Sequence, residues 1–244
     1  MNTEAVEMPR QSRLQLVRRG AAAGFPIVLG YIPVALTYGV IAGQSGLTIA
    51  ELTLMSVLVF AGAAQFLAVS MVAAGTGAIE IIIATFVLNF RHFVMSLSFM
   101  NRLRRIALKA KIPLSLGLTD ETFTMSSLHK REAKEEYGSW FYASLMLTAY
   151  LSWVGGSFLG GLLGDIIPSR LSESMGVALY AMFIGLLIPS VKKHSRIAYI
   201  AVIAMAVNYV FQLWGISQGW AIVIGTLAGG LCGIWILEDE EEEV

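Results

Sequence analysis

The sequence predicts an all-α protein that crosses a membrane several times, and three observations support this fold class. Hydrophobic residues make up 56% of the 244 residues and charged residues only 14%, whereas about a quarter of a soluble domain is charged. Mean hydropathy is correspondingly high, at +0.70. Apolar runs of about twenty residues, the length that a helix needs to cross the bilayer, occupy nearly the whole chain. We therefore expect one transmembrane bundle without a separate soluble domain.

The charged residues gather at the two ends and in a few loops. We expect a basic cytoplasmic tail over residues 1–20, which could include an interfacial helix, a single transmembrane domain over 21–237 and an acidic tail over 238–244. Because the formal net charge is zero, the overall balance gives no indication of nucleic-acid binding. The single cysteine, Cys232, cannot form an internal disulfide, and its apolar surroundings favour a packing role.

The first apolar run, residues 21–43, is long enough to span the bilayer and has no clear cleavage site, so we expect it to stay attached as the first span and not to be a cleavable signal peptide. Pro26 and Pro33 weaken its backbone hydrogen bonding. We expect a kink or an unwound turn near residues 30–33. The next apolar runs cover residues 50–74 and 78–100.

Residues 113–128 are too short and too polar for an ordinary span, and basic clusters lie on both sides of them. The positive-inside rule places both clusters in the cytoplasm, so we expect this segment to dip into the membrane and return. With it, the chain has seven apolar runs plus one dipping segment. The four remaining runs lie at about 138–164, 174–191, 197–214 and 218–237.

The direction in which the first half crosses the membrane stays open. Three full spans from a cytoplasmic N-terminus would place the basic cluster at residues 102–111 outside, against the positive-inside rule. Either one of the first three runs is broken and does not cross, or residues 113–128 cross fully. We favour broken helices. Asn89 and Asn208 occupy corresponding runs of the two halves, which is consistent with a three-span repeat.

Polar side chains within the apolar runs are the candidate functional residues. A charged side chain near the centre of the bilayer costs about 2.5–3.5 kcal/mol, so something must offset that cost, and a polar substrate is the usual reason. The candidate residues are Gly62, Gln65, Asn89, Arg91, Asp120, Glu121 and Asn208.

Three motifs in order carry a resemblance to a known family. They are Phe60-Ala-Gly-Ala-Ala-Gln-Phe66, Asn89-x-Arg91-His92 and Thr119-Asp120-Glu121, in a seven-run chain of this length. The chain resembles the AzlC-type branched-chain amino acid permeases over about residues 20–237. This resemblance implies the large subunit of a two-component exporter of leucine, isoleucine and valine, with methionine as a further candidate. It also implies a small AzlD-type membrane partner, proton coupling, no cofactor and a place in the bacterial cytoplasmic membrane.

A leucine-like zwitterion needs partners for its two charges and an apolar pocket. Arg91 would bind the carboxylate through its planar guanidinium group. Asp120 or Glu121 would meet the ammonium or carry a proton. The amides of Gln65, Asn89 and Asn208 would orient the substrate, and Gly62 would let the backbone approach it if the helix opens there.

Each assignment has a structural alternative. Arg91 could extend to the membrane interface, and residues 119–122 could simply cap a helix. Gln65 and Asn208 could be hydrogen-bonding contacts between helices. Rows of glycine at every fourth position, such as Gly225, Gly229 and Gly233, favour close helix packing over a docking face for another subunit.

Other function classes find less support in the sequence. An intramembrane enzyme would need a catalytic cluster, but His92, His129 and His194 are dispersed and no metal-ligand or nucleophile motif is present. A non-transporting assembly subunit would not need charged groups at membrane depth. We therefore expect a transporter rather than an enzyme, and uptake instead of export remains an alternative.

Overall fold

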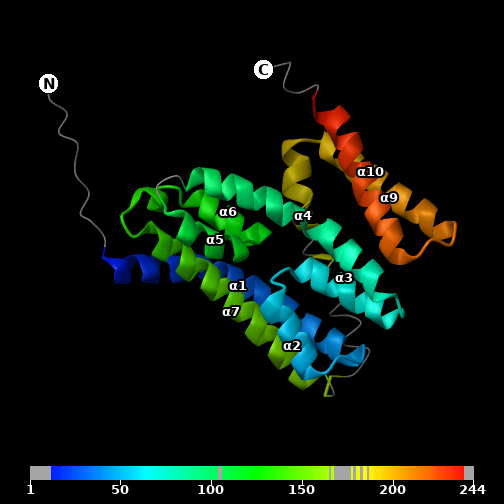
Figure 1. The fold of residues 1–244 in the computed structure, drawn as a ribbon, viewed down its shortest axis with the longest axis horizontal. Helices are drawn as coiled ribbons and strands as arrows, with labels where there is room; N and C mark the ends of the chain where they lie inside the picture. Colours follow the sequence, from blue (N-terminus) through cyan, green and yellow to red (C-terminus); the bar gives the residue numbers. More distant parts are fainter. Residues whose placement is uncertain are drawn as a thin grey trace. The chain divides into compact units, whose positions relative to one another are not determined.

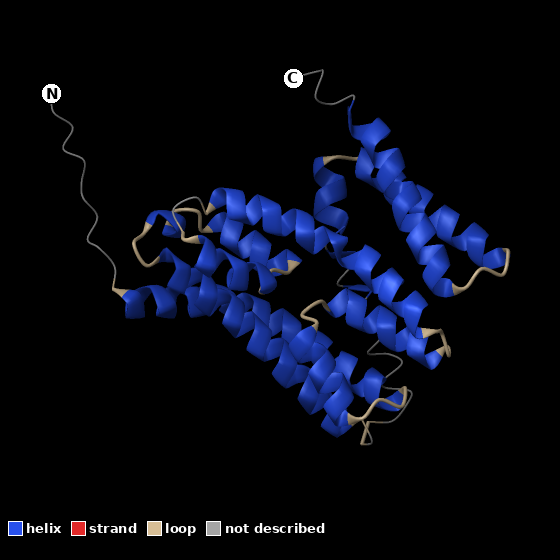
Figure 2. Cartoon of the chain, in the orientation of Figure 1, coloured by secondary structure: helices blue, strands red, loops and turns tan. Residues whose placement is uncertain are grey.

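The computed structural model of the protein describes residues 12–103, 106–164, 166–167, 177, 180–181, 184–185 and 187–238. Within these ranges the chain is helical with short turns and no strand (Figures 1 and 2). The helices are α1 (Arg13–Gln44), α2 (Ile49–Leu58), α3 (Gly62–Ala73), α4 (Ala78–Arg102), α5 (Leu108–Leu116), α6 (Asp120–Leu128), the short 3-10 helix η1 (Glu132–Lys134), α7 (Gly138–Leu163), α9 (Arg196–Leu213) and α10 (Gln218–Glu238).

Long apolar helices confirm the predicted class of all-helical membrane protein. Within the described ranges, the segments long and apolar enough to cross a membrane are Arg13–Gln44, Ala78–Asn101, Gly138–Leu163, Arg196–Leu213 and Gln218–Ile236. The expected run at 174–191 lies partly outside the described residues. The count of seven runs therefore stays a prediction.

The second apolar run is broken rather than continuous. It consists of α2 and α3, which have 10 and 12 residues and are separated at residues 59–61. At about 1.5 Å per residue, neither helix alone is long enough to cross a hydrocarbon core of about 30 Å. Thr48 and Glu51 form a capping box at the start of α2, which fixes where that helix begins.

The first span, by contrast, is not interrupted. Pro26 and Pro33 lie inside α1, which runs continuously from Arg13 to Gln44. Of the kink or unwound turn expected near residues 30–33, the unwound turn does not occur and the kink stays a prediction. Membrane helices tolerate proline where neighbouring groups satisfy the freed carbonyls. The helix also begins earlier than expected: residues 13–20, assigned to the tail, form about its first two turns and are held by the buried side chain of Leu16.

The segment at residues 113–128 forms two short helices. The helices α5 and α6 have nine residues each and are separated at residues 117–119. Thr119 is the N-cap of α6 and exchanges hydrogen bonds with Thr122, so the capping role considered for residues 119–122 is confirmed. Both helices are too short to span the bilayer individually.

The chain divides into two compact units that interleave in sequence. The first unit comprises Met1–Pro33 and Arg91–Gly156, and the second comprises Val34–Phe90 and Ser157–Val244. The helices α1, α4 and α7 contribute residues to both units, so neither unit is one continuous stretch of the chain.

Glycines allow α1 and α7 to approach closely within each unit. In the first unit, a Cβ on Gly20 would overlap the carbonyl oxygen of Phe141, and one on Gly24 would lie 2.9 Å from the carbonyl oxygen of Leu145. In the second unit, a Cβ on Gly160 would overlap the carbonyl oxygen of Leu36. Residues later in α1 contact residues later in α7, so the two helices run parallel. Such backbone contacts tolerate only glycine.

In the second unit, α9 and α10 pack as an antiparallel pair (Figure 1). The glycine row of α10 faces α9, because a Cβ on Gly225 would lie 2.9 Å from the carbonyl oxygen of Ala204 and one on Gly233 would lie 3.3 Å from Ile200. The expected packing role of this row is confirmed. At the start of α10, Glu80 from the first turn of α4 accepts hydrogen bonds from Ser217 Oγ and, at 3.2 Å, from the backbone N–H of Trp220.

Candidate functional site

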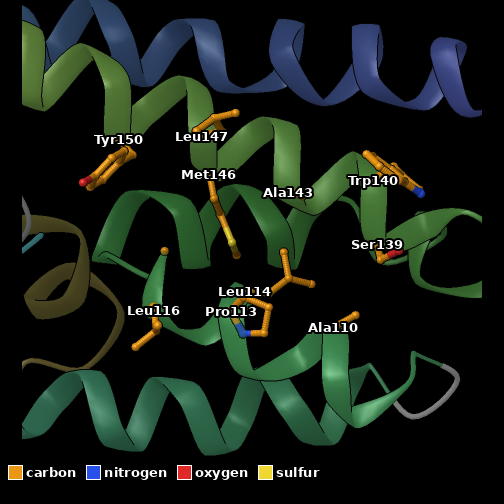
Figure 3. A pocket seen from close by; sticks show the side chains of 11 residues that line it. Ala110, Pro113, Leu114, Leu116, Ser139, Trp140, Ala143, Met146, Leu147 and Tyr150 are labelled. Atoms are coloured by element: carbon orange, nitrogen blue, oxygen red, sulfur yellow. The ribbon is translucent and has the colours of Figure 1, made fainter. Parts of the chain in front are cut away.

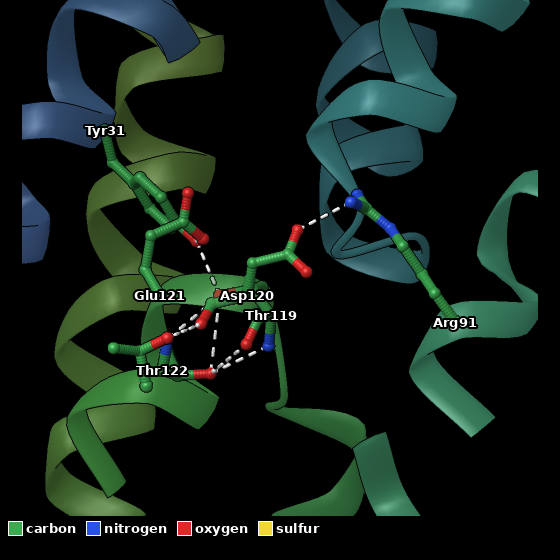
Figure 4. A network of polar contacts seen from close by, with 7 residues as sticks. Tyr31, Arg91, Thr119, Asp120, Glu121 and Thr122 are labelled. Carbon is green, nitrogen blue, oxygen red and sulfur yellow. Dashed lines mark hydrogen bonds and ion pairs between the residues drawn. The ribbon is translucent and has the colours of Figure 1, made fainter. Parts of the chain in front are cut away.

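An ion pair joins α4 to α6 in the first unit. Arg91 Nη1 lies 2.6 Å from Asp120 Oδ2, and the two side chains are 34% and 27% exposed (Figure 4). Arg91 belongs to the apolar span Ala78–Asn101. Each charge is costly in such surroundings, and the partner offsets part of that cost. Arg91 Nε is also buried, and no hydrogen-bond partner for it occurs among the described residues, so a donor remains available.

A second polar group lies beside the ion pair. The hydroxyl of Tyr31, on α1, donates a hydrogen bond of 2.6 Å to Glu121 Oε2 and lies 2.6 Å from Thr119 Oγ1 (Figure 4). Tyr31 is only 6% exposed, and its ring packs edge-on against Trp153 of α7 at 5.3 Å. Three hydroxyl or carboxyl oxygens therefore form a continuous chain of short contacts.

The cap of α6 explains why the two acidic residues have different partners. Thr119 is extended, with φ −128° and ψ 176°, and the helix begins directly after it. Asp120 and Glu121 are thus in the first turn of α6, where the helix dipole stabilises negative charge. Successive helical residues differ by about 100° in direction, so Asp120 points toward α4 and Glu121 toward α1 (Figure 4).

Gln65 belongs to a buried polar chain in the second unit. Its Nε2 donates to Ser56 Oγ at 2.8 Å, and Ser56 Oγ donates to Ser157 Oγ at 2.9 Å. All three side chains are fully buried. This chain connects α2, α3 and α7, which is the helix-to-helix role considered for Gln65. Gly62 is the first residue of α3, whose N-cap, Ala61, makes no side-chain capping bond.

The two asparagines also lie in the second unit. Asn208 Oδ1 accepts a hydrogen bond of 2.7 Å from Gln212 Nε2, one turn further along α9. Asn89 Oδ1 is buried and is without a hydrogen-bond partner in the described part of the chain. The structure therefore brings Arg91, Asp120 and Glu121 together in the first unit. A single binding site that also includes the second-unit residues stays a prediction.

An apolar cavity of about 460 Å³ lies between α5 and α7 in the first unit (Figure 3). Its lining includes Pro113 and Gly117 from one side and Trp140, Met146 and Tyr150 from the other. Gly117 lies three residues before Asp120, so this cavity adjoins the break between α5 and α6. Among the described residues, no group of three or more His, Cys, Asp or Glu side chains is placed to hold a metal ion.

Sequence reasoning missed Tyr31, Ser56 and Ser157. Tyr31 lies in the stretch singled out for its glycine and proline residues, but nothing in the sequence distinguishes its hydroxyl from that of any other tyrosine in an apolar run. The pairing of Ser56 with Ser157 joins residues far apart in the chain. A single sequence carries no signal for it.

Comparison with known proteins adds the family context. The family model described as AzlC protein matches residues 26–167. An uncharacterized membrane protein of Archaeoglobus fulgidus is 34% identical over 92% of this chain and 97% of its own length. The inner membrane protein YgaZ of Escherichia coli is 27% identical over 88% and 86%. The branched-chain amino acid transport protein AzlC of Bacillus subtilis is 26% identical over 70% and 66%. No solved structure matches the chain.

Proposed function

We propose that this chain, which belongs to the AzlC protein family, is a secondary transporter that exports branched-chain amino acids across the bacterial cytoplasmic membrane. Its substrates would be leucine, isoleucine and valine, with methionine as a further candidate. Transport would be coupled to protons and would involve a small AzlD-type membrane subunit. The relative from Bacillus subtilis is named for branched-chain amino acid transport, which supports this substrate class.

The Arg91–Asp120 ion pair is the observation that carries the proposal. A zwitterion can enter such a pair without leaving either charge alone, because its carboxylate takes the guanidinium group and its ammonium takes the aspartate. An anion or a cation would leave one side of the pair unmatched, which is strongly unfavourable in a membrane. The unpartnered Arg91 Nε would donate to the second oxygen of the substrate carboxylate.

The apolar cavity of the same unit would receive the branched side chain of the substrate. Its lining is dominated by apolar side chains, and its volume of about 460 Å³ is well above that of a leucine side chain.

The remaining candidate residues lie in the second unit and are proposed to line the path of the substrate: Gly62, Gln65, Asn89 and Asn208. Asn89 is the best placed of these, because its buried Oδ1 can accept a hydrogen bond from an ammonium group.

The test is retention of radiolabelled leucine in cells that express the chain with its small partner subunit. Lower retention than in cells without the chain is the expected result, and higher retention would indicate uptake instead. The matched control is Arg91→Ala, which should return retention to the background level at equal abundance in the membrane. Unchanged retention in all strains would contradict the proposed function.

A further inference from the structure

Asp120 and Glu121 are neighbouring carboxylates with different partners. Asp120 pairs with the guanidinium group of Arg91 at 2.6 Å. Glu121 accepts a hydrogen bond from the neutral hydroxyl of Tyr31 at 2.6 Å, and no cation within ion-pair distance of it occurs in the described ranges. Protonation of Asp120 would therefore remove an ion pair, whereas protonation of Glu121 would change only a hydrogen bond.

Building on the proposed transport function, we propose that Glu121 carries the coupling proton, and that Tyr31 is the positioning residue of this proton site. Asp120 remains paired with Arg91 and serves the substrate ammonium. A hydronium ion on one side of the membrane gives its proton to a carboxylate oxygen of Glu121, so one O–H bond of hydronium breaks as the O–H bond of Glu121 forms. On the other side the O–H bond of Glu121 breaks and the proton returns to a water molecule.

The hydrogen-bond chain around Glu121 can be satisfied in both protonation states. When Glu121 is ionised, the hydroxyl of Tyr31 donates to it. When Glu121 is protonated, its O–H donates to the oxygen of Tyr31, whose own hydroxyl then turns to Thr119 Oγ1 at 2.6 Å. Thr119 can donate onward to Thr122 Oγ1 at 3.3 Å, and Thr122 to the carbonyl oxygen of Gly117 at 3.0 Å. Only hydroxyl hydrogens need to move.

Asp120 lacks this reversibility. Protonating it would remove the counter-charge of Arg91 inside an apolar span, and an unpaired buried charge is strongly unfavourable. With Glu121 ionised, the cluster of Arg91, Asp120 and Glu121 has a net charge of about −1, and protonation of Glu121 brings it to zero. A cluster without net charge can be exposed first to one side of the membrane and then to the other at a lower electrostatic cost than a charged cluster.

Among the residues that the structure describes, few other groups bear on the charge of Glu121. Tyr31 faces it from α1, Asp120 adjoins it on α6, and Arg91 of α4 acts through Asp120. From α7, Trp153 packs on the ring of Tyr31 and does not titrate. The two protonation states are therefore governed mainly by one hydroxyl and one neighbouring ion pair.

The experiment uses the full chain with its partner subunit in proteoliposomes. Leucine flux is measured with and without an imposed pH gradient, and the ratio of the two fluxes is compared between variants. For the wild type we expect a ratio clearly above one. Glu121→Gln should reduce the ratio to one, because it cannot bind the proton. Tyr31→Phe should keep a ratio above one but move its pH midpoint upward, since the hydrogen bond that favours the ionised carboxylate is lost.

The control is Glu51→Gln. Glu51, like Glu121, is a carboxylate in the first turn of a helix whose N-cap is a threonine. Its Oε2 accepts a hydrogen bond of 2.8 Å from the backbone N–H of that threonine, Thr48, and its contacts belong to the capping box. Its variant should keep the wild-type ratio. A gradient response that survives in Glu121→Gln would overturn the proposal, and so would a pH midpoint that does not move in Tyr31→Phe.

Infrared difference spectroscopy of the purified protein separates this proposal from the transport function. A pH step should reveal the C=O stretch of a protonated carboxyl in dry surroundings, at higher frequency than that of a hydrated one. This band should be absent in Glu121→Gln and present in Glu51→Gln and Asp120→Asn. If the band behaves so but the wild type moves no leucine, the proton site stands and the substrate assignment fails. Persistence of the band in Glu121→Gln overturns the proton site.

Discussion

The two charges of the Arg91–Asp120 pair depend on each other, because either one alone would be unmatched within an apolar span. We expect Arg91→Ala and Asp120→Asn each to reduce leucine flux at least about 10-fold, less than for a fully buried pair because the two side chains are 34% and 27% exposed. Flux in proteoliposomes, normalised to the amount of inserted protein, is the measurement. Arg13→Ala is the control, since this exposed arginine stacks over the ring of Tyr137 and is not part of the proposed site. Near-normal flux in either pair variant would remove that residue from the site.

The same pair should select zwitterions among molecules with the same carbon skeleton. The 2-oxo acid of leucine lacks the ammonium, and 3-methylbutylamine lacks the carboxylate, so each leaves one member of the pair unmatched. We expect both to compete with radiolabelled leucine at least about 100-fold less well than unlabelled leucine. Competition by either analogue at leucine-like concentrations would contradict insertion of the substrate between Arg91 and Asp120.

At the residue scale, the sequence identifies functional candidates better than their partners. Arg91, Asp120 and Glu121 are conspicuous because charges in apolar runs are costly, and the structure places these three together. The partner of Glu121 is Tyr31, which lies 90 positions earlier in the chain. Such a pairing depends on which helices pack together, and the periodicity of one segment does not contain that information.

At the scale of helices, the apolar runs are predictable but their breaks are not. Proline predicted a kink or an unwound turn in α1, and the unwound turn does not occur, whereas the run at residues 50–74 breaks at residues 59–61 without any proline. Breaks between α2 and α3 and between α5 and α6 both adjoin buried polar side chains, Gln65 and Thr119. Long-range hydrogen bonds, which a sequence pattern does not reveal, satisfy these side chains and hold the broken ends in place.

The buried chain from Gln65 through Ser56 to Ser157 should therefore stabilise the break between α2 and α3. Gln65→Leu leaves the serine hydroxyls short of a partner, at a cost of about 1–3 kcal/mol. A chain of this size loses about 2–4 °C in Tm per kcal/mol, so a clear drop is expected in thermal unfolding of the detergent-solubilised protein. The matched control is Gln212→Leu, an exposed amide on α9, which should change Tm little. Equal shifts in both variants would contradict the role of Gln65.

At the scale of the whole chain, contacts constrain the membrane topology that the sequence leaves open. Arg19 pairs with Glu132 at 2.6 Å, and α1 runs parallel to α7, so we expect both helices to leave from the face of the basic N-terminus, which the positive-inside rule predicts to be cytoplasmic. The same rule predicts a cytoplasmic start for α9, because basic residues lie at 192–196. If α9 crosses the membrane, α10 begins on the opposite face.

Glu80 bears on the direction in which α4 runs. It bonds Ser217 and Trp220 at the start of α10, so α4 and α10 begin on the same face. With α10 beginning on the non-cytoplasmic face, the basic cluster at residues 102–111 is predicted to be cytoplasmic, in agreement with the positive-inside rule. We therefore predict that α2 and α3 together enter the membrane and return without crossing it. The same reasoning predicts that α5 and α6 form a second re-entrant pair, open to the cytoplasm.

Single cysteines in a Cys232→Ala background test this topology. We expect Thr76→Cys and Gln218→Cys to react with a membrane-impermeant maleimide from outside intact cells, and Lys109→Cys and Lys134→Cys to react only after the membrane is opened. Lys134 is a better position than the nearby Gly138, because a Cβ on Gly138 would overlap the carbonyl oxygen of Glu132. Protection of Thr76→Cys in intact cells together with labelling of Lys109→Cys would mean that α2 and α3 cross the membrane. Arg91 would then approach the outer face rather than the cytoplasmic one, and the direction in which the Arg91–Asp120 pair meets its substrate would have to be reversed.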